Sequence, residues 1–195
     1  MIKNGFIEKD IFFNKPNTLN TFKPNIENFG VILKGKSIDK LSWVAKEFSN
    51  CFIVNNFDKE IELIGEYLLG KNIVHFSNRS FRTAPLTLEN YNKFGISEIQ
   101  LYTSNIFWDK RLLYAVYLYQ SMGLRTVFLP KYLLHFSRIM FGQEYEKKFP
   151  LTGLSAIIYA LEIIKPKNLW IIGLDFYQSD YLVRRNWNTP IEVMR

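Results

Sequence analysis

Short apolar segments, rich in β-branched and aromatic residues, alternate along this chain with longer segments in which apolar residues recur at helical spacing. Such a chain folds into a mostly parallel sheet with helices on both faces, because each helix returns the chain to the edge where the next strand begins. The expected strands are residues 31–33, 51–54, 72–76, 98–102, 126–129 and 169–172. The expected helices are residues 39–48, 58–69, 107–122, 132–141 and 154–164. The sequence predicts one α/β domain over residues 29–195, after a loosely ordered segment 1–28.

Two local features complete this outline. Asp58 stands at the start of a helical pattern, where we expect it to be the N-cap residue. Residues 77–95 are polar and lack a clear period, so we expect a loop there. The chain has 195 residues, of which 48% are apolar, so it is long enough and apolar enough to bury a full core.

The net charge of +7 favours an anionic partner such as a nucleotide, a nucleic acid or an anionic membrane surface. The basic residues are spread along the sequence without a nucleic-acid-binding motif, so a nucleic acid is not expected as a partner. The helix at 107–122 carries Tyr114, Tyr117 and Tyr119. These rings suit the core or the contact between subunits of a homo-oligomer, with peripheral membrane contact as the alternative.

The compartment is indicated by cysteine usage and by the N-terminus. Cys51 is the only cysteine, and we expect it to be a small buried side chain in an apolar run. A chain without internal disulfides fits a reducing compartment. The N-terminus lacks the apolar core of a signal peptide, and no run approaches the ~18 apolar residues of a membrane span. We expect a cytoplasmic protein, with peripheral attachment at the inner membrane as the alternative.

Gly30, Gly35, Lys36 and Ser37 match the phosphate-binding loop pattern G-x-x-x-x-G-K-[ST]. That pattern predicts a kinase or NTPase if the four middle residues form a loop that cradles phosphates. Here those residues have the composition of a strand, which favours a simpler interpretation. Residues 35–37 are then the first turn from a strand to a helix, and such turns contact nucleotides in many α/β folds.

Polar residues follow two of the expected strands. Asn55 follows the second strand and Asn78 the third, where an amide side chain could bind a base, a ribose or a phosphate. The alternative is that Asn is a common turn residue in an Asn-rich chain. His75 and His135 lie in apolar surroundings and are expected in the core, and no metal or cofactor site is expected.

Two strings near the end of the chain fall where an α/β site is expected. Thr152 and Gly153 open a helix, and residues 173–178, with the sequence Gly-Leu-Asp-Phe-Tyr-Gln, follow a buried strand. The second string resembles the Gly-Ile-Asp-Phe-Tyr-Gln string of the bacterial lipooligosaccharide sialyltransferases of glycosyltransferase family forty-two. Residues 152–153 are similar to that family's Thr-Ser-Gly turn. The order of similar motifs spans residues 31–181, with the close matches in the last thirty.

The resemblance implies a single Rossmann-like domain that transfers a sugar from a CMP-sugar donor to a glycan acceptor without a metal. It implies that the donor's nucleotide and sugar bind at the following residues: Gly35, Asn55, Asn78, Thr152, Gly153, Gly173 and Asp175. It further implies that Tyr177 and Tyr181 hydrogen-bond the phosphate of the leaving group.

The chain departs from that family in its catalytic residues. The family's general base is a histidine downstream of the Asp-Phe-Tyr string, whereas no histidine follows His135 here, so the base is unknown. Lys36 stands where the family has an Asn, and the family's Arg before the Thr-Ser-Gly turn is replaced. Three functions stay open: a sialyltransferase-like enzyme, active or degenerate; a non-catalytic nucleotide- or glycan-binding module; and a phosphate-loop kinase or NTPase.

Overall fold

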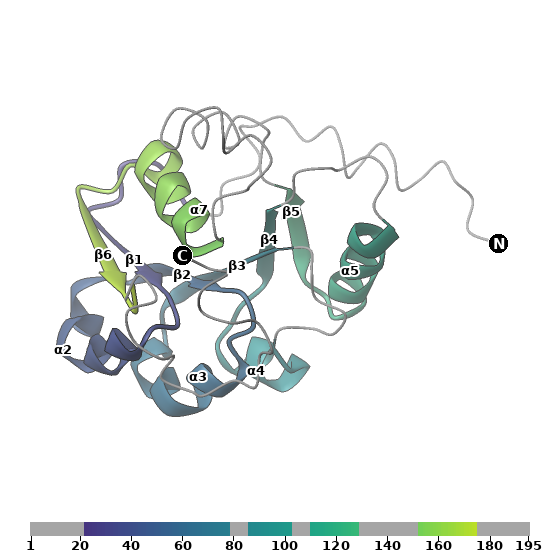
Figure 1. The fold of residues 1–195 in the computed structure, drawn as a ribbon, viewed down its shortest axis with the longest axis horizontal. Coiled ribbons are helices and arrows are strands. Elements are labelled where there is room, and N and C mark those ends of the chain that lie inside the picture. Colours follow the sequence, from purple (N-terminus) through teal and green to yellow (C-terminus); the bar gives the residue numbers. More distant parts are fainter. Residues whose placement is uncertain (1–21, 79–85, 103–109, 129–151, 175–195) are drawn as a thin grey trace, which may run out of the picture.

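The computed structural model describes residues 22–78, 86–102, 110–128 and 152–174 (Figure 1). Within these residues, six strands form one sheet in the order β5-β4-β3-β2-β1-β6, and every neighbouring pair is parallel. The strands are β1 (Asn28–Ile32), β2 (Asn50–Val54), β3 (Asn72–Asn78), β4 (Glu98–Tyr102), β5 (Arg125–Phe128) and β6 (Asn168–Ile172). The predicted α/β class with a parallel sheet is therefore confirmed.

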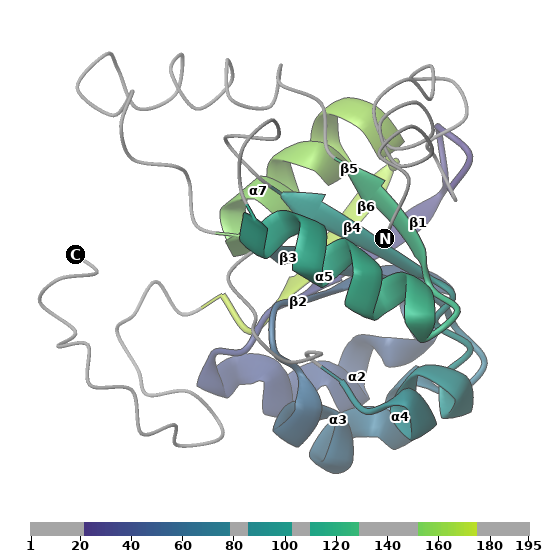
Figure 2. The same cartoon turned by 90° about the vertical axis from the view of Figure 1, so that its right-hand side faces the viewer.

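Helices cover both faces of this sheet (Figures 1 and 2). One face carries η2 (Lys36–Lys40), α2 (Leu41–Val44), η3 (Ala45–Glu47), α3 (Asp58–Ile64), η4 (Gly65–Leu68), α4 (Leu88–Lys93) and α5 (Lys110–Ser121). The other carries α7 (Thr152–Tyr159), which continues as the π-helical η6 (Ala160–Ile164). This three-layer arrangement is Rossmann-like.

The alternation of side chains along β1 separates the two apolar cores. Phe29 and Val31 face α7, while Ile32 faces the layer of α2 to α5. Gly30 also faces the layer of α2 to α5, where an added Cβ would come within 2.5 Å of the Phe48 ring. Strands β1 and β2 are buried on both faces and read as apolar runs, which is why they could be located from sequence, whereas the edge strand β6 is partly exposed.

The connections create a switch point in the sheet. From β1 to β5 each step moves in one direction, with its helix in the layer of α2 to α5. The step to β6 goes back to the far side of β1, with α7 on the opposite face. Both kinds of step have the same handedness, as the rule of right-handed crossovers requires. The direction of the connections therefore changes between the neighbouring strands β1 and β6, which makes this pair the topological switch point of the sheet.

The helix expected at residues 39–48 is in fact three short pieces, η2, α2 and η3. A 3₁₀ segment rises about 2.0 Å per residue against 1.5 Å in an α-helix, so these pieces cover the length of the sheet with fewer residues. Phe48 then returns to an extended conformation, and its ring is buried. Lys71 holds the end of this helical segment, because its Nζ donates to the carbonyl oxygens of Ala45 (2.5 Å) and Phe48 (2.6 Å).

Two local predictions were wrong. Asp58 is the first residue of α3, and Phe57 occupies the N-cap position. The polar stretch 77–95 is not one loop, because β3 runs on to Asn78 and the stretch also contains α4. Thr87 caps α4 by accepting the N–H of Asn90 at 3.2 Å. The expected helix 132–141 and the start of the helix at 107–122 lie outside the described residues.

Part of the segment expected to be loosely ordered belongs to the core. Phe22 is 2% exposed and packs edge-on against Phe29 and Phe52, with ring centroids 4.9 Å and 5.6 Å away. Cys51 is buried as predicted, and burial raises the pKa of its thiol to about 12. Within the described ranges, none of the helices combines the length and apolar character needed to cross a bilayer.

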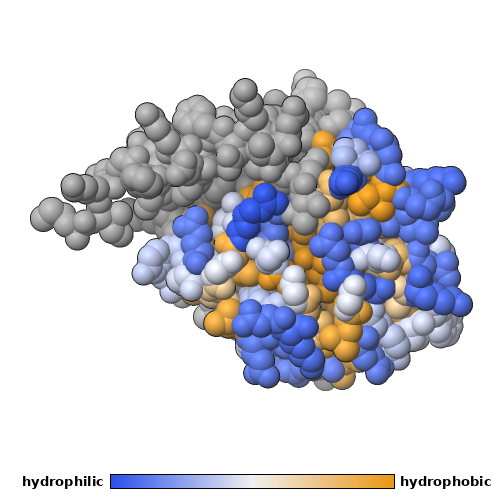
Figure 3. Space-filling model, turned by 180° about the vertical axis from the view of Figure 1, so that it is seen from behind, coloured by the Kyte–Doolittle hydropathy of each residue, from blue (hydrophilic) through white to orange (hydrophobic). Residues whose placement is uncertain are grey.

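Exposed apolar side chains are distributed over several elements. On the face seen in Figure 3, orange apolar areas lie between blue hydrophilic ones. On α5, Tyr119 is buried whereas Tyr114 (55% exposed) and Tyr117 (68% exposed) point to solvent. The helix therefore supplies one of its three tyrosines to the core, and the other two are free for the surface contacts considered above.

Candidate functional site

The carboxyl ends of β1 and β6 remain joined beyond the last residue of each strand. The N–H of Leu33 donates to the carbonyl of Ile172 at 2.8 Å, and the N–H of Gly35 donates to the carbonyl of Gly173 at 2.9 Å. These bonds hold the first turn after β1 against the turn after β6 at the switch point. In open α/β sheets, ligands bind outside the carboxyl ends of the strands at such a point.

Gly173 is required by this close approach. Its φ is +76°, and a Cβ there would lie 2.5 Å from the carbonyl oxygen of Leu33. A side chain would thus be strained twice, by the left-handed conformation and by contact with backbone that cannot move aside. Gly35 is buried in the same turn, just before η2. The structure therefore brings together two of the predicted site residues from opposite ends of the domain.

The start of α7 meets the same turn from the other face of the sheet. A Cβ on Gly153 would lie 3.0 Å from Cδ2 of Leu33, and Thr152 beside it is 6% exposed. The far end of the same helical segment lies at the amino edge, where Ile164 accepts the N–H of Asn25. The amino end of α7, and with it the positive end of the helix dipole, therefore lies at the carboxyl edge of the sheet.

Asn55 and Asn78 lie further along that edge, after β2 and within the end of β3. Asn55 is half-buried with φ at +55°, a conformation that Asn tolerates better than most residues. Its N–H donates to the carbonyl of Phe76 at 2.9 Å. Asn78 is the last residue of β3, and its side chain lies outside what the structure describes. The structure thus places Asn55 one strand away from Gly35, and Asn78 one strand further.

Lys34 is a feature of this edge that the sequence interpretation missed. It is 6% exposed, and its Nζ donates to the carbonyl oxygen of Asn56 at 3.3 Å. Its charge is close enough to His75 to contribute to lowering the pKa of that ring. The signal was in the sequence, since a lysine that directly follows an apolar strand and precedes a glycine turn must lie at the carboxyl edge.

His75 lies in the core beneath the edge, as predicted. Its Nδ1 is 2.9 Å from the Tyr91 hydroxyl and its Nε2 is 2.5 Å from the carbonyl oxygen of Asn55. Burial, more than the Lys34 charge, lowers the pKa of His75 to about 4, while the bond to Asn55 works in the opposite direction. The ring is therefore neutral at neutral pH.

Other predicted residues cannot be placed. Asp175, Tyr177 and Tyr181 follow the last described residue, Leu174, and His135 also lies outside the described ranges. The structure therefore shows the approach to the Asp-Phe-Tyr string but not the string itself.

The phosphate-loop interpretation of Gly30 to Ser37 is wrong. Gly30 and the two residues after it belong to β1 and pair with both β2 and β6, so they cannot form a cradle of free N–H groups. The simpler interpretation is confirmed, since Gly35 directly precedes η2 and belongs to the turn that follows β1.

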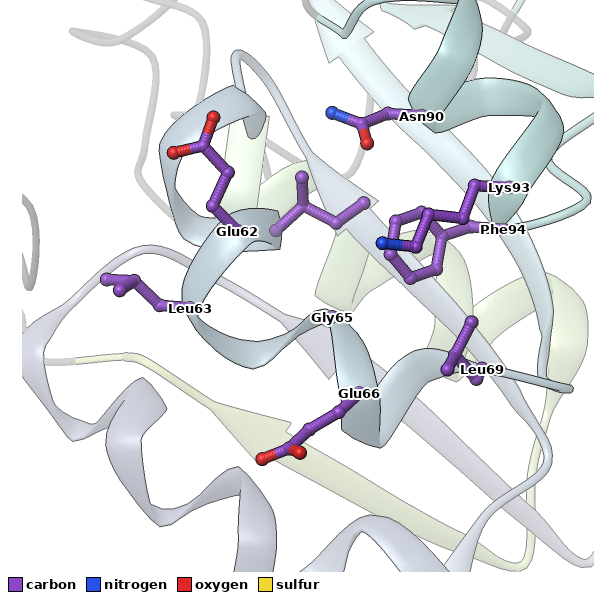
Figure 4. Close-up of a pocket in the computed structure, with 9 residues that line it drawn as sticks. Glu62, Leu63, Gly65, Glu66, Leu69, Asn90, Lys93 and Phe94 are labelled. Atoms are coloured by element: carbon purple, nitrogen blue, oxygen red, sulfur yellow. The ribbon is translucent and has the colours of Figure 1, made fainter.

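A separate pocket of about 410 Å³ lies between α3–η4 and α4 (Figure 4). It is lined by Ile61, Glu62, Leu63, Gly65, Glu66, Leu69, Asn90, Lys93 and Phe94. Figure 4 shows Phe94 facing Gly65, where a Cβ would come within 2.6 Å of the ring. None of the predicted site residues lines this pocket, so it is not the site that the switch point defines.

Over the described ranges, no group of three or more His, Cys, Asp and Glu side chains is placed to hold a metal ion. The chain matches no family model and no curated protein sequence.

Proposed function

We propose that this chain binds a nucleotide sugar at the switch point between β1 and β6. The observation that carries the proposal is the contact of the β1 turn with Gly173, where a glycine is needed because two backbone segments approach within bonding distance. Because glycines carry no side chain, a turn built from them lets a ligand come close to main-chain N–H groups, as in dinucleotide-binding folds.

The charges at this edge suit a phosphate group. Lys34 carries a buried positive charge next to the turn, and the positive end of the α7 dipole lies at the same edge. A phosphate ester bound there would exchange its hydration for these fixed dipoles and charges. Asn55 and Asn78 would hydrogen-bond the base or ribose from the neighbouring strands, and Thr152, Gly153 and Asp175 would complete the donor site.

The finer proposal is a metal-independent, sialyltransferase-like transfer from a CMP-sugar to a glycan acceptor. The acceptor hydroxyl oxygen attacks the anomeric carbon, the bond from that carbon to the CMP phosphate oxygen breaks, and the acceptor proton passes to a general base. Tyr177 and Tyr181 would donate hydrogen bonds to the departing phosphate, as the resemblance implies. The base is unassigned, because no histidine follows His135 in the sequence. The buried Cys51 thiol fits a cytoplasmic location, and the exposed Tyr114 and Tyr117 suit contact with a second copy or with the inner membrane.

Ligand-dependent thermal stability tests the binding proposal. CMP and CMP-sialic acid should raise the Tm of the full chain. At a ligand concentration one hundred times Kd, binding should add about 2.7 kcal/mol to the free energy of unfolding. Mg²⁺-ATP and GDP-sugars should give no comparable shift. Turnover of CMP-sialic acid that is lost in Tyr177→Phe then separates a transferase from a binding module. If neither CMP nor CMP-sialic acid raised the Tm, the proposal would be contradicted.

A matched pair of glycine variants tests the location. Gly173 and Gly123 both have φ at +76°, but an added Cβ meets backbone at 2.5 Å in Gly173 and open space in Gly123. Ala at either position adopts the left-handed conformation at a cost of roughly 1–2 kcal/mol. We expect Gly123→Ala to bind CMP normally and Gly173→Ala to lose ~10-fold or more in affinity, or about 1.4 kcal/mol.

Gly153→Ala covers the case in which Gly173→Ala does not fold. Its Cβ would meet only the end of the Leu33 side chain, at 3.0 Å, which can shift. We expect a folded protein with weakened CMP binding. Normal CMP affinity in Gly153→Ala, or in a folded Gly173→Ala, would place the site elsewhere.

A further inference from the structure

The buried imidazole of His75 joins the turn after β2 to helix α4. The side chain is 0% exposed and makes one bond from each ring nitrogen, to Tyr91 of α4 and to Asn55 in the turn after β2. Both partners are far from His75 in sequence, by 16 and 20 residues. The ring therefore links the turn after β2 to the helix layer through a fully buried contact.

The chemistry of the partners determines the tautomer. The carbonyl oxygen of Asn55 can only accept, so Nε2 of His75 must carry the proton. In the neutral ring Nδ1 then accepts, and the Tyr91 hydroxyl donates to it. The titratable groups that influence this contact are Lys34, whose charge lowers the pKa of His75, and Tyr119, which raises the pKa of Tyr91. Burial is the largest cause of both shifts, and both shifts favour the neutral forms.

This bond acts on an unusual backbone conformation. Asn55 has φ at +55° and is bonded on both sides to β3, through its N–H to Phe76 and through its carbonyl to His75. A turn whose N–H and carbonyl are both held cannot return to the ordinary right-handed conformation without breaking a buried hydrogen bond, which is unfavourable because the separated groups are left without partners. The left-handed turn is therefore tied to the state of the histidine.

We infer that His75 is a positioning residue for the nucleotide site. Its Nε2–H bond to the Asn55 carbonyl holds the turn after β2 in the left-handed conformation, and so sets where Asn55 lies on the carboxyl edge. The inference rests on the proposed function, since it concerns the geometry of the same site, and it adds a residue that does not itself touch the ligand.

Two variants of nearly equal shape separate the hydrogen bond from packing. His75→Gln keeps an N–H donor near the position of Nε2, whereas His75→Met fills a similar volume without a donor. With CMP as the probe, we expect His75→Gln to bind within about threefold of the unchanged protein, and His75→Met to bind ~10-fold more weakly, the equivalent of one lost buried hydrogen bond. Affinities are compared at a temperature where denaturant titration shows each variant to be more than nine-tenths folded. Equal affinities of the Gln and Met variants would overturn the inference.

Tyr91→Phe is the matched control for general destabilisation. It also removes one buried hydrogen bond from His75, but on the Nδ1 side, away from Asn55. We expect a lower Tm with CMP affinity retained within about threefold, because the bond to the Asn55 carbonyl is intact. A loss of affinity in Tyr91→Phe as large as in His75→Met would also overturn the inference.

A ligand-free measurement keeps this test distinct from that of the proposed function. The NMR chemical shifts of the Asn55 amide, Cα and Cβ report its backbone conformation. These shifts should stay left-handed in His75→Gln and Tyr91→Phe and change in His75→Met. If CMP fails to bind the unchanged protein but the shifts follow this pattern, the proposed ligand is wrong and the positioning role stands. Unchanged Asn55 shifts in His75→Met would reject the positioning role whatever the ligand.

Discussion

At the scale of single residues, the carboxyl edge of the sheet carries several residues with unusual conformation or burial. Gly173 and Asn55 both have positive φ, Lys34 is a buried lysine, and His75 is a buried histidine with two bonds. Each costs folding free energy when considered alone, through strain or desolvation. Features of this kind persist where surrounding structure compensates for them, and they cluster at functional sites more often than elsewhere.

The neutral state of His75 makes stability depend on pH in a defined window. The folded-state pKa of about 4 lies below the ordinary 6.5, so the unfolded chain binds more protons between these values. The stabilisation from neutral His75 is therefore complete above pH 6.5 and is lost as the pH falls toward 4, by at most about 3 kcal/mol.

Urea unfolding at pH 7.5 and pH 4.5 checks this pH dependence. His75→Gln, which has no titratable ring, should lose less stability than the unchanged protein over the same interval. The difference between the two isolates His75 from the carboxylates, which are common to both. An equal loss in the two proteins would show that His75 is not the group responsible.

At the scale of elements, the strands were predictable from sequence and the short helices were not. Strands β1 and β2 are buried on both faces, so their apolar runs could be recognised without knowing which strands they pair with. The short helix α4 exposes most of its residues and buries Tyr91, too few apolar positions to establish a helical period. The short helices that follow β1 depend on Lys71, the residue directly before β3, which donates to the carbonyl oxygens of Ala45 and Phe48.

The site also contains some features that a short stretch of sequence indicates and others that depend on residues far apart in the sequence. Glycine turns and asparagines at strand ends could be found because they directly follow apolar runs. The bond of His75 to Asn55 joins residues 20 positions apart, and its existence follows from strand register rather than from any local pattern. The contact of Gly173 with Leu33 likewise depends on β6 lying beside β1, which the sequence did not indicate.

Helix α4 offers a test at this scale. Thr87 accepts the Asn90 N–H and is the residue that caps the helix. Thr87→Ala should lower the free energy of unfolding by about 1 kcal/mol, whereas Thr87→Ser, which keeps the hydroxyl, should change it little. Urea unfolding at pH 7.5 measures both. A similar loss in the two variants would mean that the hydroxyl does not cap the helix.

At the scale of the whole molecule, the order of the strands explains why residues from distant parts of the sequence meet. Strand β6 returns to lie beside β1, so the last described turn contacts the first. Helix α7 crosses the opposite face and brings its amino end to the same place. Gly35, Gly153 and Gly173 therefore converge through topology, and the pocket between α3 and α4 lies apart from them.

The most direct test of a nucleotide site at the switch point is an NMR titration of the full chain with CMP, followed through assigned backbone amides. The account predicts saturable shifts centred on the amides of Gly35, Gly153 and Gly173, with Asn55 affected as well. Saturable shifts confined to Leu63, Leu69 and Lys93 in the separate pocket, or no shifts at millimolar CMP, would contradict it.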